Sequence, residues 1–162
     1  TLSVGICNGC QLMMELELIN PEHEVHGKMK HNTSQKHESG FTSVKVQKNN
    51  SVMLSSLEGA TLGVWISHGE GKFKLPYAED KYNVVAKYAY ANYPANPNGT
   101  KNGIAGLCTK DGRHTFMMPH IERVSASNDH LPYKPDDFDF KNPIWEKAFK
   151  NMYDWLSNIN SN

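Results

Sequence analysis

The sequence has no long apolar run, no excess of one charge and few cysteines, and each absence argues against a class of protein. No segment approaches the roughly 20 consecutive apolar residues that a membrane-spanning helix needs. Lys and Arg together number 17, as do Asp and Glu, so no basic surplus indicates a nucleic-acid partner or an anionic membrane surface. Cys7, Cys10 and Cys108 do not make a secreted disulfide framework, and we expect a reducing, cytoplasmic environment.

What is present fits an α/β domain or part of one. The chain has 162 residues, of which 38% are hydrophobic, and this suits a single core. We interpret residues 1–162 as one portion of a longer polypeptide, because the chain opens on Thr1 and only one strand precedes the first motif. Apolar or alternating runs predict strands at 2–6, 41–48, 60–67, 84–91, 103–109 and 113–118, the last two forming a hairpin around Asp111-Gly112.

Two segments have helical spacing. The first covers residues 9–19 and ends before Pro21, because a residue that precedes proline avoids helical angles. The second opens at Pro143, which suits the first turn of a helix. The apolar residues at helical spacing in the first are Leu12, Met13, Leu16 and Ile19. The predicted inner face of the second is Ile144, Phe149, Met152, Tyr153 and Leu156. Residues 21–38, with four histidines, predict a long polar loop, and 92–102 are nearly all turn formers.

The sequence GICNGCQ at 5–11 predicts a nucleophile at a strand-to-helix corner. An apolar strand stops at Cys7, a second glycine follows at Gly9, and helical spacing begins there. The arrangement is similar to the Gly-x-Ser-x-Gly elbow of hydrolases, with sulfur in place of oxygen. A thiol at the start of a helix faces free N–H groups and partial positive charge. We therefore expect a depressed pKa for Cys7 and a thiolate suited to covalent catalysis.

The sequence MMPHIER at 117–123 supplies the base that such a nucleophile needs. His120 directly follows an apolar strand, and α/β proteins place active sites at strand ends. Glu122, two residues on, could fix the tautomer of the imidazole and favour its charged form. Two other interpretations stay open: Glu122 could pair with Arg123, and His120 could be an ordinary structural histidine.

These motifs together resemble the class I, or triad, glutamine amidotransferases. The resemblance rests on Gly5-x-Cys7-x-Gly9-x-Gln11 and on Pro119-His120-x-Glu122. Further motifs that occur in the same order as in the family are HGEGKF at 68–73, YPANPNG at 93–99, GIAG at 103–106 and DGR at 111–113. With them, residues 2 to 125 resemble the C-terminal glutaminase domains of the large, fused phosphoribosylformylglycinamidine synthases. The resemblance implies a flavodoxin-like α/β sheet flanked by helices, here an incomplete domain that lacks its N-terminal strands.

The resemblance also implies roles for individual residues. Cys7 would attack the side-chain amide of glutamine, His120 would carry the proton, and Glu122 would orient His120. The backbone N–H of Asn8 would be one oxyanion donor. The residues implied to bind the substrate glutamine are Gln11, His68, Gly69, Glu70 and Gly71. No cofactor or metal is expected in this segment. Ammonia would pass to a synthetase region of the same polypeptide, where ATP and Mg²⁺ act on formylglycinamide ribonucleotide in purine biosynthesis.

Two departures from the family pattern matter. Ile121 stands where the family usually has proline, so we expect its backbone to take the extended form that proline enforces. The family domain also has roughly a hundred further residues before the elbow, including a glycine-rich turn that gives the second oxyanion donor. Losing one such donor typically costs on the order of 10²–10³ in rate. We therefore expect the chain by itself to be a poor glutaminase.

Several plainer interpretations compete with the enzymatic one. Cys7 and Cys10 form a C-x-x-C, which could be a redox pair or half of a zinc site, although the loop histidines match no common zinc spacing. Cys10 is more simply a buried helix residue, and His68 is either a pocket residue or the polar end of a buried strand. The chain could serve another triad amidotransferase, or act as a docking or regulatory module whose triad is unused.

Overall fold

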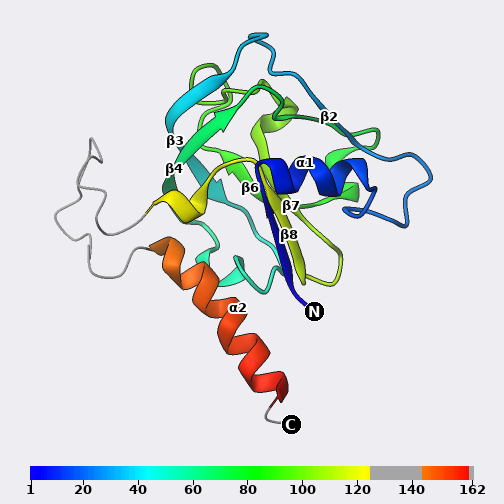
Figure 1. Cartoon of the computed structure of the whole chain (residues 1–162), viewed down its shortest axis with the longest axis vertical. Coiled ribbons are helices and arrows are strands. Elements are labelled where there is room, and N and C mark those ends of the chain that lie inside the picture. Colours follow the sequence, from blue (N-terminus) through cyan, green and yellow to red (C-terminus); the bar gives the residue numbers. More distant parts are fainter. Residues whose placement is uncertain (125–143, 161–162) are drawn as a thin grey trace, which may run out of the picture.

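A six-stranded sheet with a helix on each face forms the body of the protein (Figure 1). The computed structural model describes residues 1–124 and 144–160. The helices are α1 (Asn8–Glu15) and α2 (Ile144–Asn160), with short 3₁₀ turns at Ser55–Leu57, Glu79–Lys81, Lys101–Gly103 and Ile121–Arg123. The strands are β1 (Ser3–Ile6), β2 (Lys28–Lys30), β3 (Glu38–Val46), β4 (Thr61–His68), β5 (Lys72–Lys74), β6 (Asn83–Tyr88), β7 (Ile104–Cys108) and β8 (His114–Met117).

The large sheet has the strand order β1-β8-β7-β6-β3-β4, and β2 pairs with β5 in a separate small sheet. The pair β1–β8 is parallel, whereas the other neighbours in the large sheet are antiparallel. The predicted α/β class and all six predicted strands are confirmed, as is the hairpin of β7 and β8. The long polar loop predicted at 21–38 is interrupted by β2, which forms there by pairing with β5, a strand that lies far along the chain.

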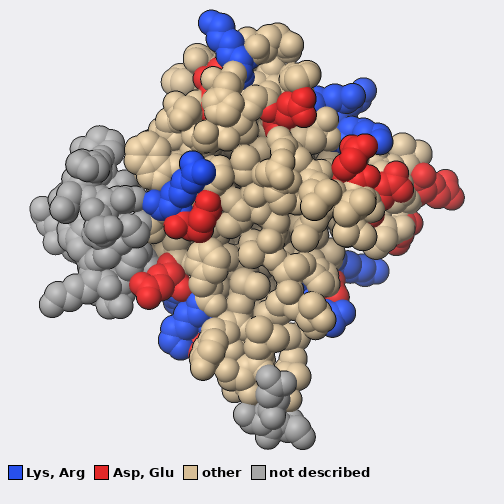
Figure 2. Space-filling view, viewed as in Figure 1, with Lys and Arg blue, Asp and Glu red and all other residues tan. Residues whose placement is uncertain are grey.

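Alternation along the strands divides the apolar side chains between the two faces of the sheet. On β8, Phe116 joins a cluster with Cys10 and Met14 of α1, while Met117 joins a second cluster with Trp145 and Ala148 of α2. Neighbouring strand residues thus point to opposite sides, as the pleat requires. Charged side chains stay outside this core, and on the face seen in Figure 2 the described Lys and Arg residues lie among Asp and Glu rather than in a field of one sign.

The sheet curls so that its two ends approach each other. In the strand order β4 is farthest from β1, but Trp65 of β4 forms an antiparallel bridge with His120, which follows β8. The backbone N–H of His120 donates to the carbonyl of Trp65 at 2.7 Å. This closure brings the residue after β8 against the edge of β4, and it sets the position of the site described below.

Of the four apolar residues at helical spacing in the first predicted helix, Met13 and Ile19 pack in or against the core and the other two do not. Helix α1 has only eight residues, and it buries Cys10 and Met14, whereas Leu12 and Leu16 are each 56% exposed. It ends at Glu15, well before Pro21, because Glu17 takes a left-handed φ of 60° that breaks the helical path. The periodic apolar residues fit more than one face, and the contact of α1 with β1 and β8 selects the face that contains Cys10.

The predicted inner face of the last helix also needs correction. Trp145 and Ala148 of α2 are buried, and the indole N–H of Trp145 donates to the carbonyl of Gly63 at 2.8 Å. This bond and the small Ala148 fix which side of α2 meets the sheet. Of the predicted inner residues, only Met152 packs against the core; Ile144, Phe149, Tyr153 and Leu156 are exposed. Pro143 lies outside the described residues.

Candidate active site

The structure contains the predicted corner at Cys7. Its backbone takes φ 51° and ψ −104°, a strained combination for a residue with a side chain. The corner is held from both sides, since the N–H of Cys7 donates to the carbonyl of Met117 at 2.8 Å and its carbonyl accepts from the N–H of Gln11 at 3.0 Å. A Cβ on Gly5 would lie 3.0 Å from the backbone of Gly9, so the close approach of strand and helix requires glycine there. Apart from its chain neighbours and the backbone of its own helix, no described residue comes within 4 Å of a Cβ placed on Gly9.

The thiol of Cys7 is half-buried, and its electrostatics differ from the prediction. Sγ lies 3.6 Å from the carbonyl oxygen of Ser67, at the end of β4. Burial raises the pKa of Cys7 above its ordinary value, although the backbone N–H of Asn8 and the charge of Arg123 act to lower it; the charge of Glu122 raises it further. The expected depressed pKa was therefore wrong, because desolvation outweighs the helix start. A thiol of this kind reacts only when a base removes its proton.

His120 and Glu122 form the predicted hydrogen-bonded pair. Nδ1 of His120 lies 2.6 Å from Oε1 of Glu122, and His120 is buried while the Glu122 side chain is 40% exposed. The same carboxylate oxygen is 3.6 Å from Nε of Arg123, so Glu122 meets both of its predicted partners. A carboxylate at Nδ1 leaves the lone pair of Nε2 able to accept a proton.

Ile121, between the histidine and the glutamate, does not take the extended backbone that the family's proline suggested. It is the first residue of the 3₁₀ turn Ile121–Arg123, and its side chain is buried in the core with Trp145. A 3₁₀ turn uses a φ close to the one that proline imposes. The turn therefore accepts either residue, and the isoleucine adds buried apolar surface.

Strand β4 brings the two predicted catalytic residues to one place. His120 donates its backbone N–H to Trp65, and the Cys7 thiol contacts the carbonyl of Ser67, two residues further along the same strand. The arrangement is a thiol that follows β1 and a hydrogen-bonded His–Glu pair that follows β8, both in contact with β4.

The predicted glutamine-binding residues also lie together. The side-chain amide of Gln11 donates to the backbone carbonyl of Glu70 at 2.6 Å and accepts from the Asn8 side chain at 3.2 Å. Glu70 Oε1 lies 3.2 Å from Nε2 of His31. Next to Glu70, no described residue other than the two chain neighbours comes within 4 Å of a Cβ built on Gly69. The start of α1 is thus tied to the turn that follows β4, although a role in binding glutamine stays a prediction.

His68 is the buried polar end of β4, one of the two possibilities that the sequence left open, and its role as a pocket residue stays a prediction. Its side chain is 3% exposed, and Nδ1 lies 3.1 Å from Oδ1 of Asn32. Burial, together with the nearby His37 and His120, lowers the pKa of His68 to about 4. Gly71 carries no side chain because a Cβ there would lie 2.6 Å from the imidazole ring of His68.

Sequence reasoning missed two buried asparagines beside this turn. Asn32 and Asn98 are fully buried, and both bond the turn that contains Gly71. Asn98 lies in the NPNG text quoted for the resemblance, so a signal existed, but the segment was interpreted only as turn formers. Asn32 lies in the histidine-rich loop and carries no pattern that separates it from a solvated asparagine.

The loop histidines and the second cysteine have separate neighbours. His23 stacks edge-on against Tyr77 and Tyr82, and His26 lies 3.5 Å from Glu17. Within residues 1–124 and 144–160, no three His, Cys, Asp or Glu side chains come together as metal ligands do. Cys10 is fully buried, as predicted, and burial raises its pKa. In the part of the chain that the structure describes, no helix combines the length and apolar character needed to cross a membrane.

Two curated relatives cover almost the whole chain. The phosphoribosylformylglycinamidine synthase of Drosophila melanogaster is 37% identical over 98% of this chain. A probable phosphoribosylformylglycinamidine synthase of Arabidopsis thaliana, described as chloroplastic/mitochondrial, is 39% identical over 96% of it. The chain spans only 13% of the length of the first relative and 12% of the second.

Two solved structures share the fold. A chain of the PurLQS structure from Thermotoga maritima has a TM-score of 0.71 and 25% identity, over 96% of this chain and 62% of that one. A Thermoplasma acidophilum protein described as a putative GMP synthase component has a TM-score of 0.55 and 16% identity, over 98% of this chain and 58% of that one, which supports the fold alone. Residues 1–156 match the family of CobB/CobQ-like glutamine amidotransferase domains, and the chain belongs to that family.

Proposed function

We propose that this chain is the glutaminase portion of a phosphoribosylformylglycinamidine synthase, with Cys7, His120 and Glu122 as its catalytic residues. The observation that carries the proposal is the thiol at a strained corner, placed on the same strand edge as a His–Glu pair. The synthase activity proposed for the whole polypeptide rests on the relatives of that name, which are 37% and 39% identical to this chain.

In the first half of the reaction, His120 accepts the proton of Cys7 at Nε2, because the raised pKa of the thiol leaves it protonated at neutral pH. Sγ then attacks the side-chain amide carbon of glutamine. The negative oxygen that develops accepts a hydrogen bond from the backbone N–H of Asn8, which already faces the thiol. Glu122 stabilises the imidazolium through Nδ1. His120 returns its proton to the amide nitrogen, the C–N bond breaks, and ammonia leaves a γ-glutamyl thioester on Cys7.

In the second half, His120 takes a proton from water, and the hydroxide attacks the thioester carbon. The C–S bond breaks, glutamate is released, and the proton on His120 returns to the sulfur. Gln11 and the His68–Gly71 turn form the wall against which glutamine lies in this proposal. The bond between Gln11 and the Glu70 carbonyl fixes that wall relative to the nucleophile.

Ammonia then passes to a synthetase region of the same polypeptide, the proposed partner, which converts formylglycinamide ribonucleotide with ATP and Mg²⁺. We assign no residue of this chain to ATP or Mg²⁺. The chain alone is a slow glutaminase in this proposal, since Asn8 is the one oxyanion donor assigned to it. A cytoplasmic location stays a prediction, and one relative is described as chloroplastic/mitochondrial.

The test uses the complete gene product that contains this chain. After treatment with an electrophilic glutamine analogue, peptide mapping is expected to find an adduct on Cys7 that glutamine prevents, with Cys10 unlabelled as the internal control. A Cys7→Ala variant is expected to lose glutamine-dependent synthesis of formylglycinamidine ribonucleotide while retaining synthesis from ammonium ions. The two results together identify the nucleophile, the nitrogen donor and the acceptor.

Other results would select among the alternatives. Equal labelling of Cys7 and Cys10, or none, overturns the triad and favours a redox or docking role. A second outcome is selective labelling of Cys7 in a protein that does not act on formylglycinamide ribonucleotide. If that protein delivers ammonia to the acceptor of another synthetase, the chain belongs to a different amidotransferase.

A further inference from the structure

The turn from His68 to Gly71 is held by a buried side chain from a distant part of the sequence. Asn32 is 0% exposed, and its backbone N–H donates to the carbonyl of Gly69 at 2.8 Å. Its side-chain amide donates to the carbonyls of His68, at 2.7 Å, and Lys36, at 2.9 Å. Its Oδ1 accepts the backbone N–H of Gly71 at 3.2 Å. One residue therefore binds three of the four residues in the turn.

These bonds also fix the tautomer of His68. The carbonyls of His68 and Lys36 can only accept, so they take the NH₂ group of Asn32, and the N–H of Gly71 can only donate, so it takes Oδ1. His68 Nδ1 contacts the same Oδ1 and must therefore carry the proton. The other ring nitrogen, Nε2, is then a bare acceptor; it is buried and has no partner among the described residues.

A second buried asparagine, Asn98, binds the backbone of Gly71 at its carbonyl. The Asn98 amide donates to the carbonyl of Gly71 at 2.6 Å, and Asn98 Oδ1 accepts the N–H of Thr100 at 3.0 Å. The backbone N–H and the backbone carbonyl of Gly71 are thus both bound by buried asparagine side chains. Buried amides that are fully bonded restrict a loop to one conformation, because any other arrangement leaves polar groups unpaired.

The turn adjoins one and contains the other of the two contacts on which the candidate site depends. At its start, the carbonyl of Ser67 contacts the Cys7 thiol, and within it the carbonyl of Glu70 accepts from Gln11. A change in the turn therefore moves the wall of the glutamine site relative to the nucleophile.

We propose that Asn32 is a positioning residue of the glutaminase site: it holds the His68–Gly71 turn and keeps His68 in the Nδ1–H tautomer. This role deepens the proposed function and rests on it. Asn32 touches neither the thiol nor the His120–Glu122 pair. It gives the histidine-rich loop, residues 21–38, a part in the site that its sequence does not suggest.

The test compares Asn32→Ala with Asn96→Ala in the complete gene product. Asn96 is a matched control, because it is also buried and its amide also donates to two carbonyls, those of Ala91 and Thr100, without touching the turn. Asn32→Ala is expected to raise the KM for glutamine at least about tenfold, with kcat changed less, because ground-state contacts along the wall are lost. Asn96→Ala is expected to leave KM within about twofold, whatever it costs in stability.

Nitrogen-15 NMR of the histidine side chains gives a second readout that a purely structural role does not move. The wild-type protein is expected to show His68 protonated at Nδ1, and Asn32→Ala is expected to shift it toward the Nε2–H form. Gly71→Ala perturbs the same ring from its other side, since the added Cβ would lie 2.6 Å from it, and is expected to raise KM as well. It serves if Asn32→Ala does not fold.

The possible outcomes separate the two proposals. Equal KM values for Asn32→Ala and Asn96→Ala, or a wild-type His68 protonated at Nε2, overturn the role of Asn32. A wild-type protein that neither hydrolyses glutamine nor reacts at Cys7 overturns the proposed function instead, and the tautomer of His68 still tests the geometry around Asn32.

Discussion

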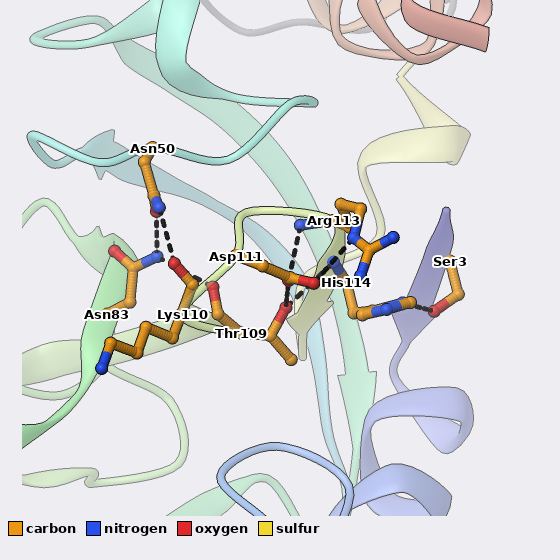
Figure 3. A network of polar contacts seen from close by, with 8 residues as sticks. All are labelled: Ser3, Asn50, Asn83, Thr109, Lys110, Asp111, Arg113 and His114. Atoms are coloured by element: carbon orange, nitrogen blue, oxygen red, sulfur yellow. Dashed lines mark hydrogen bonds and ion pairs between the residues drawn. The ribbon is translucent and has the colours of Figure 1, made fainter. Parts of the chain in front are cut away.

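The same two strands, β1 and β8, carry polar clusters of opposite character at their two ends. At the amino ends, Ser3 and His114 are register partners, and Ser3 Oγ lies 2.7 Å from His114 Nδ1 (Figure 3). Beside them Asp111 accepts bonds from the Thr109 hydroxyl at 2.6 Å and from Arg113 Nε at 2.7 Å. At the carboxyl ends lie Cys7 and His120. One end ties a hairpin together, and the other assembles the candidate active site.

The two ends of β1 and β8 differ in how completely their polar groups are hydrogen-bonded. In the hairpin, the side chains bond one another and the backbone across the turn, as the dashed lines of Figure 3 show. At the site, Cys7 has a strained positive φ, Glu122 is partly exposed, and His68 Nε2 has no described partner. Strain and unmet bonding potential persist where a site uses them, whereas a satisfied network stabilises the fold. We expect mutations at the two ends to affect different measurements.

The largest expected effect comes from the histidine at each end. His120→Ala is expected to lower kcat/KM for glutamine hydrolysis on the order of 10³-fold, because the thiol loses its base. His114→Ala is expected to leave kcat/KM within about threefold and to lower the free energy of unfolding by about 1 kcal/mol through the lost bond to Ser3. Steady-state kinetics and urea unfolding of both variants make the comparison. A large loss of activity in His114→Ala would show that the two ends are coupled.

A smaller effect is expected at the carboxylate that orients His120. Glu122→Gln keeps the shape of the side chain but removes the charge that stabilises the imidazolium and selects its tautomer. Because the Glu122 side chain is 40% exposed, water partly replaces it, and we expect a loss of about 10²-fold in kcat rather than the 10⁴-fold known for a buried triad carboxylate. Pre-steady-state measurement of thioester formation checks this expectation. An unchanged kcat would contradict the orienting role and leave Arg123 as the partner that matters.

Much of the fold could be predicted from local patterns, because strands have a strong signal here. The β-branched run 60–67 differs from β4 by one residue at each end, and Asp111-Gly112 identified the hairpin. The corner at Cys7 was equally accessible, since glycines on both sides of a cysteine have few structural uses. The helix faces were not, because apolar residues at positions such as Leu12 and Phe149 fit helical spacing without meeting the sheet.

The features that sequence could not supply depend on contacts between distant segments. The pKa of Cys7 follows from burial against β4, which no residue near Cys7 encodes. The closure of the sheet through Trp65 and His120 likewise joins two segments that are far apart in the chain. Asn32 matters because it meets the His68–Gly71 turn, and a polar loop gives no sign of which of its residues becomes buried.

The smallest expected effect concerns Asp111, whose carboxyl lies at the amino ends of β1 and β8 and has a strongly perturbed pKa. The Thr109 hydroxyl and Arg113 hold the pKa of Asp111 well below its usual range in the folded protein, whereas in the unfolded chain it is about 3.9. The folded state therefore binds fewer protons, so the contribution is complete above about pH 5 and declines as the pH falls through 4. Asp111→Asn is expected to cost under about 1 kcal/mol at pH 7, because the carboxylate is 43% exposed. In urea unfolding, the gap to wild type narrows in acid while kcat/KM at pH 7 stays unchanged. A gap that is constant with pH removes the electrostatic account, and a fall in kcat/KM removes the division between the two ends of β1 and β8.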